Sequence, residues 1–268
     1  MRDATRPLPF GVGARAVFDL SLDGMVFSRR SLLMALLVAA PVGFAILYRV
    51  LAATHGTPPL GPSDLYALMV AVYWVRNVLP LAALFYATSL VADEVEGRTL
   101  TYLLTRPITR ASIMAGKFAA YLATTLTLAL PAAVVTFFVL MTSPAAPALG
   151  PASVDLLRDL GVMLLALVAY GALFALLGVL LKRPVIPGLL FLYGWELLAN
   201  LPGYLPRLTL TAWLRSLIRH RPAEEGIAGL FQQVLPGDQA LAVLVGVSLV
   251  LLASAGWIFS RREYVLEQ

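Results

Sequence analysis

The chain has 268 residues, of which 60% are hydrophobic and 13% are charged, and its mean hydropathy is +0.84. This composition excludes an ordinary soluble protein of one or two domains, which would need a charged surface. The absence of cysteine excludes a disulfide framework and a thiolate metal site. The net charge of +5 comes mostly from arginines at the ends of apolar runs, which argues against a nucleic-acid-binding stripe.

Several apolar runs of about 20 residues fit a bilayer core about 30 Å thick. Because backbone groups in lipid must bond within a helix or a closed barrel, and barrel alternation is missing, we expect helices. The predicted fold class is all-α: a polytopic membrane protein with about six transmembrane helices, cytoplasmic termini and interfacial helices. Residues 1–268 form a single transmembrane domain in this prediction. The first apolar run is longer than the h-region of a signal peptide, so no cleaved signal is expected.

Residues 1–30 form a basic segment ahead of the first apolar run. Between Gly13 and Phe27, apolar side chains alternate loosely with Asp19 and Asp23, which indicates a helix on the membrane surface. Two interpretations remain open for this cytoplasmic or interfacial segment. It either helps to hold a cytoplasmic partner or acts as a basic flank that sets the orientation of the chain.

The first span is predicted over residues 31–53 and the second over residues 66–92. The second span carries Arg76 and Asn77 inside its apolar run. An arginine within a span should face protein or water and have a partner, and the best candidate is Glu196 in the fifth span. This pair is either a polar latch or substrate contact, or a structural ion pair that locks two helices. The structural ion pair is the favoured interpretation.

The third span is predicted over residues 113–141, with Thr124 and Thr127 on one face ahead of Pro131. This face either lines a path or forms a packed kink at the proline, and the kink is favoured. Four residues are candidates for lining a pathway: Asn77, Thr124, Thr127 and Asn200.

The fourth span is predicted over residues 156–181. Its Gly171, Ala175 and Gly178 lie at helical spacing and form a small-residue face that allows close helix packing. The fifth span, over residues 185–201, is short and interrupted by proline and glycine, and such spans often lie beside binding sites.

Residues 202–238 form the longest external segment. It is expected to contain two short amphipathic helices, Thr209–His220 and Glu224–Leu235, which lie at the outer headgroup layer. The sixth span is predicted over residues 239–260.

The distribution of basic residues predicts the topology of the chain. The loops at 54–64 and 142–155 contain no lysine or arginine, whereas the segment 202–238 carries several arginines. Because cytoplasmic loops are enriched in these residues, both termini are placed inside. The predicted cytoplasmic segments are 1–30, 93–112, 182–183 and 261–268.

Asp93–Lys117 is the most charged segment between two long apolar runs. It contains an acidic pair, a glycine turn, an apolar strip and a basic turn before the next span: Asp93-Glu94, Glu96-Gly97-Arg98-Thr99, Leu100–Leu104, Arg106-Pro107 and Gly116-Lys117. This order resembles the loop between the second and third spans of ABC-2 type permeases, the membrane subunits of one group of ABC transporters. The resemblance implies a short coupling helix that binds a separate cytoplasmic ABC ATPase. Its recurrent positions would be Glu94, Gly97, Thr99, Arg106, Pro107 and Lys117.

Work from ATP hydrolysis must reach the spans as rigid-body movement, so the contact should be short and stiff. Gly97 allows a sharp turn, and the leucines of 100–104 are spaced to bury one side of a short helix. Charges at the rim would tune the choice of partner and the association rate more than the affinity. The alternative is a solvated basic loop. The predicted ATPase interface contains Glu94, Glu96, Gly97, Arg98, Thr99, Leu103, Arg106, Pro107, Arg110 and Lys117.

No catalytic motif is present in the sequence. Lys117 is followed by Phe118, so the phosphate-binding cradle of an ATPase is missing, and no zinc-protease or serine-hydrolase motif occurs. We therefore expect a transport subunit that is not an enzyme and holds no metal or cofactor, with ATP and Mg in the partner.

The expected function is ATP-driven export of an amphipathic or hydrophobic substrate by alternating access. The protein would be a multi-pass subunit of a prokaryotic inner or plasma membrane, paired with a second copy or a related permease, and would bind no nucleic acid. The alternatives are an ATP-independent secondary transporter or channel, and a membrane scaffold.

Overall fold

The computed structural model describes residues 9–26, 28–56, 60–96, 109–144, 146–201, 203–218 and 236–261. Every regular element in these ranges is helical. In chain order they are α1 Phe10–Val26, α2 Arg29–His55, α3 Pro62–Leu68, the π-helix η1 Met69–Val78, α4 Leu79–Glu96, α6 Arg110–Met141, α7 Leu149–Leu180, α8 Val185–Tyr193, the 3₁₀-helices η2 Trp195–Asn200 and η3 Leu205–Leu208, α9 Leu210–Leu217 and α11 Gly237–Arg261.

Five helical segments of the described chain are long and apolar enough to cross a membrane. They confirm the all-α polytopic membrane fold and lie close to five of the predicted spans. These segments are Ser31–His55, Pro62–Leu90, Arg110–Met141, Leu149–Leu180 and Gly237–Arg261.

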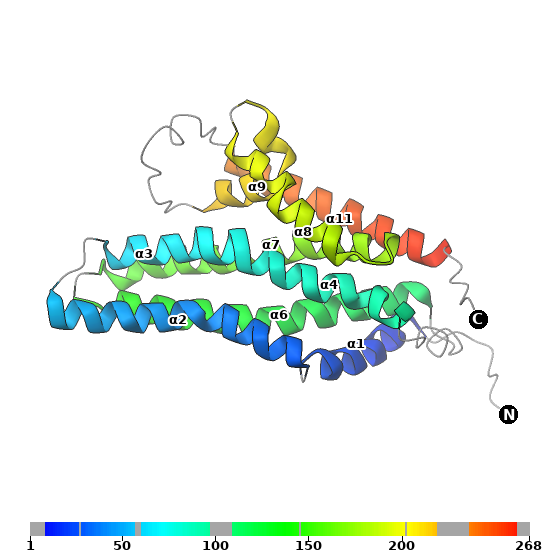
Figure 1. Ribbon diagram of the computed structural model, residues 1–268, viewed down its shortest axis with the longest axis horizontal. Coiled ribbons are helices and arrows are strands. Elements are labelled where there is room, and N and C mark those ends of the chain that lie inside the picture. The colour runs from blue at the N-terminus through cyan, green and yellow to red at the C-terminus, as the bar shows by residue number, and fades with distance from the viewer. Residues whose placement is uncertain are drawn as a thin grey trace.

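The region predicted as a span over 185–201 is a shorter apolar helical segment, below the length of the five segments found in the described part of the chain. This region forms α8 and then η2, with Gly194 between them. The nine residues of α8 cover about 14 Å at 1.5 Å per residue, less than half of a bilayer core. From the end where α7 finishes, α8 leads back toward the middle of the bundle, and α11 returns to that end (Figure 1). Consequently α1 and the last turn of α11 lie at the same end (Figure 1).

The core of the bundle is built around α7, which packs against α4, α11 and α6. Gly171 and Gly178 lie at its closest contacts, as the small-residue pattern predicts. A Cβ at Gly171 would lie 2.4 Å from the ring of Tyr121 on α6, and one at Gly178 would lie 2.6 Å from the carbonyl oxygen of Thr88 on α4. These two glycines therefore allow α7 to approach both neighbours.

The external segment is described in part. The predicted helix Thr209–His220 is confirmed as the shorter α9, while Glu224–Leu235 lies outside the described residues. The helix predicted near the N-terminus is also confirmed, as α1.

Candidate functional site

The candidate site is the end of the bundle where α4 finishes and α6 begins. Among the predicted ATPase-contacting residues, Gly97, Arg98, Thr99, Leu103, Arg106 and Pro107 lie outside the described residues. Glu94 and Glu96 occupy the last turns of α4, and Arg110 and Lys117 lie in the first turns of α6. The structure therefore describes both attachments of the segment 97–108 to the bundle.

The start of α6 is fixed by side-chain hydrogen bonds. The hydroxyl of Thr109 accepts a hydrogen bond from the backbone N–H of Ser112 at 3.2 Å, so Thr109 is the N-cap of the helix. Ser112 is fully buried, and its hydroxyl donates to the backbone carbonyl of Phe10 in α1 at 3.1 Å. The entry into α6 is thus joined to α1.

A close backbone contact continues this joint between α1 and α6. A Cβ on Gly116 would lie 2.4 Å from the backbone oxygen of Ala14 and 3.0 Å from the Cβ of Val17, which is buried. Only a residue without a side chain fits there without moving α1. As a result, α1 packs along the first half of α6 (Figure 1).

Lys117 and Arg110 connect α6 to two further helices. Lys117 is 6% exposed, and its ammonium donates to the backbone oxygen of Leu90 in α4 at 2.7 Å. Arg110 donates to the backbone oxygens of Phe259 and Ser260, at 3.1 and 3.2 Å, in the last turn of α11. A cation at a helix C-terminus also interacts favourably with the helix dipole. Both side chains, predicted to face an ATPase, are engaged within the chain in this structure.

The first two turns of α6 therefore contact three other helices. Ser112 bonds to α1, Lys117 to α4 and Arg110 to α11. Hydrogen bonds with a charged donor typically contribute about 1.5–3 kcal/mol each. The start of α6 is therefore held to α1, α4 and α11 at the same end of the bundle.

Glu196 has a role that the sequence interpretation missed. Its two carboxylate oxygens accept hydrogen bonds from the backbone N–H groups of Leu210 and Thr211, at 3.1 and 3.0 Å. The hydroxyl of Thr209 accepts a hydrogen bond from the backbone N–H of Ala212 at 3.3 Å, so the start of α9 is capped by two side chains. Within the described residues no ion pair joins Glu196 to Arg76. The structure thus assigns Glu196 to α9 in place of the expected partnership.

The residues predicted to line a pathway do not form one group. Thr124 is 3% exposed inside the bundle, whereas Thr127 is exposed. Asn200 is exposed at the end of η2, where its side-chain oxygen accepts a hydrogen bond from Arg215 at 3.0 Å. Asn77 lies apart from them, in η1.

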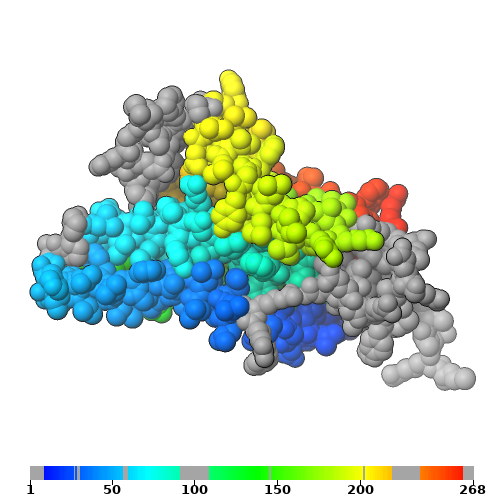
Figure 2. All heavy atoms as spheres, in the orientation of Figure 1, coloured from blue at the N-terminus to red at the C-terminus, as the bar shows by residue number. Residues whose placement is uncertain are grey.

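Asn77 lines an apolar groove of about 460 Å³ between α2 and the second span. The two spans lie side by side on the face seen in Figure 2. Phe44 and Leu51 contribute from α2, and Met69 and Tyr73 contribute from η1. The side-chain amide of Asn77 donates to the backbone oxygen of Val72 at 2.6 Å, within the π-helix η1. π-Helical turns within longer helices occur frequently at functional sites.

Comparison with known protein families identifies the family of the chain. Residues 27–194 match the family described as ABC-2 family transporter protein, so the match extends from α2 through α8. A comparison with curated proteins found no match. The family match covers more than half of the 268 residues and encloses the whole of 93–117. With its apolar spans and this match, the chain is a membrane protein that belongs to the ABC-2 family of transporters, as a transport subunit of that family.

Proposed function

We propose that this chain is the permease subunit of an ABC-2 type exporter, driven by separate ABC ATPase subunits that bind residues 93–117. ATP and Mg would be bound by those subunits. The observation that carries the proposal is the family match over residues 27–194, which encloses this segment. The contacts at the start of α6 support it, because they provide a stiff attachment for force applied from outside the chain.

In this proposal a movement of the ATPase is received by residues 97–108. The last turn of α4 and the first turns of α6 transmit it to the spans, and the bonds of Lys117 and Arg110 keep α4 and α11 in step with α6. These two cations therefore act as internal braces. The direct contacts to the ATPase fall to residues such as Glu94 and Arg106.

An amphipathic or hydrophobic substrate agrees with the apolar groove between α2 and η1. Its lining is largely aliphatic and aromatic, with Asn77 and the hydroxyl-bearing Tyr48 and Tyr73 as polar members. Such a surface suits a ligand with an apolar body and few polar groups. In the complete transporter the substrate would pass between this chain and a second permease copy.

The proposal is tested by co-purification from the native membrane with a P-loop ATPase. Charge reversals Glu94→Arg and Arg106→Glu should weaken the complex and reduce stimulated ATP hydrolysis, because each replaces an attractive contact by a repulsive one. Arg158→Glu is the matched control: Arg158 is exposed near the start of α7, at the opposite end of the bundle. Undiminished ATPase binding by the double reversal variant would contradict the coupling assignment.

A reconstituted complex separates this function from the alternatives. Export requires ATP-dependent movement of an amphipathic substrate across a vesicle membrane. Transport without ATP would identify a secondary transporter or channel, and a stable complex without any transport or stimulated hydrolysis would identify a scaffold.

A further inference from the structure

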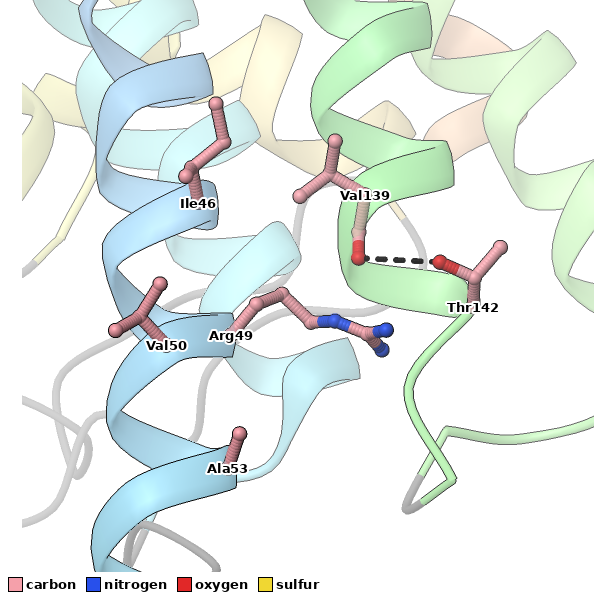
Figure 3. A pocket seen from close by; sticks show the side chains of 6 residues that line it. All are labelled: Ile46, Arg49, Val50, Ala53, Val139 and Thr142. Atoms are coloured by element: carbon pink, nitrogen blue, oxygen red, sulfur yellow. Dashed lines mark hydrogen bonds between the residues drawn. The ribbon is translucent and has the colours of Figure 1, made fainter.

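Arg49 occupies an unusual position at the end of the bundle opposite α1. It lies on α2, six residues before the helix ends at His55, and its guanidinium extends across to the C-terminal end of α6 near Thr142 (Figure 3). The Nη1 atom of this guanidinium is buried and has no hydrogen-bond partner within the described part of the chain. A buried donor left without an acceptor costs about 1–3 kcal/mol. An acceptor that meets the part of the guanidinium lining the adjacent cavity would offset the cost of keeping this charge there.

The guanidinium lines a cavity of about 450 Å³ between α2 and α6. The other lining side chains are Ile46, Val50, Ala53, Val139 and Thr142. The Thr142 hydroxyl already donates to the backbone oxygen of Phe138, at 2.8 Å, and no carboxylate is among these lining residues. The cavity thus combines apolar walls with one positive group, which is the complement of an anionic headgroup attached to an acyl chain.

The position of the cavity on the bundle indicates where that ligand comes from. Six residues correspond to about 9 Å along a helix, so Arg49 can place its charged end at headgroup level while its stem stays among apolar groups. Ile46 and Val50 are 52% and 53% exposed on the outer face of α2, so the cavity opens on the side that the bilayer covers. Its position favours a lipid of the surrounding leaflet over a molecule inside the bundle.

We propose that this cavity is a binding site for one phospholipid of the leaflet at that end, with the phosphate on Arg49 and an acyl chain along Ile46 and Val50. Arginine suits this ligand because its planar donors match phosphate oxygens in a bidentate arrangement. The bound lipid joins α2 to α6 and places its phosphate oxygens at the part of the guanidinium that lines the cavity. This site is separate from the proposed ATPase contact and does not depend on transport.

Native mass spectrometry of the full-length chain in detergent tests the site. Phosphatidylglycerol is titrated against diacylglycerol, which has the same chains without the phosphate. The unmodified protein should retain one more phosphatidylglycerol than the Arg49→Gln variant, whose affinity at this site should fall about tenfold, the effect of losing one charged hydrogen bond. Arg49→Lys should keep part of the affinity. Arg158→Gln, which removes an exposed arginine near the same end, should bind as the unmodified protein does.

A second variant keeps the charge and fills the space. Ala53 is exposed and lines the cavity, so Ala53→Phe can be accommodated toward the bilayer and should also lose the lipid while Arg49 is retained. An added arm with inorganic phosphate distinguishes a lipid site from a site for a free anion. Equal lipid retention by Arg49→Gln and the unmodified protein would overturn the proposal, as would displacement of phosphatidylglycerol by millimolar inorganic phosphate.

Discussion

Replacing Gly178 by alanine should destabilise the bundle at the contact between α7 and α4. The new Cβ would lie 2.6 Å from the carbonyl oxygen of Thr88 and 3.1 Å from its Cα, whereas ordinary contact begins at 3.4 Å. One of the two helices must therefore shift by about 0.8 Å, the difference between 3.4 and 2.6 Å. Since the opposing atoms belong to the backbone, no side-chain rotation relieves the overlap. Overpacking of this kind costs about 1–3 kcal/mol.

Gly161 provides a matched control for this substitution. It lies on the same helix, and a Cβ there would meet nothing within 4 Å. Both variants share the gain in helix propensity of alanine over glycine, about 1 kcal/mol, so the difference between them isolates the contact. We expect Gly178→Ala to unfold roughly 2–12 °C below Gly161→Ala in detergent, at about 2–4 °C per kcal/mol, followed by circular dichroism. Equal or higher thermal stability of Gly178→Ala would refute the close approach of α7 and α4.

Three further substitutions test the capping of α9 and the contacts at the start of α6. Glu196→Ala should lower the free energy of unfolding by about 1–3 kcal/mol, because it leaves two N–H groups of α9 without their acceptor. Chemical denaturation measures this loss. An unchanged denaturation midpoint would contradict the capping role. Lys117→Met removes the hydrogen bond to α4 while keeping an apolar side chain, so stimulation of ATP hydrolysis should fall more than binding of the ATPase. Equal losses of stimulation and binding would indicate that Lys117 contacts the ATPase directly. Gly116→Val should separate α1 from α6 and increase proteolysis within residues 10–26. Gly256→Val is its control, because a Cβ at Gly256 would meet no atom within 4 Å. Equal cleavage of the two variants would argue against the contact between α1 and α6.

The case of Arg76 and Glu196 shows how sequence reasoning about polar residues in spans fails. Both residues lie in apolar surroundings, so a mutual ion pair is a reasonable expectation from composition. The expectation treated 185–201 as one continuous helix, but α8 ends at Tyr193 and is followed by η2. Glu196 is thereby carried to the start of α9, where two backbone N–H groups bind its carboxylate.

The sequence by itself determined the membrane fold, five of its spans and the small-residue face of α7. These features depend on local composition and helical spacing, because hydrophobic length and the spacing of small residues act within one segment. It also pointed to the family through the order of residues in 93–117, which the family match confirms. The tertiary structure alone decided that Lys117 faces α4, that Arg110 binds the end of α11 and that Arg49 lies against α6. The physical reason is that the partner of a long polar side chain depends on how each helix is rotated and placed against its neighbours, and that arrangement is set by packing across the whole bundle.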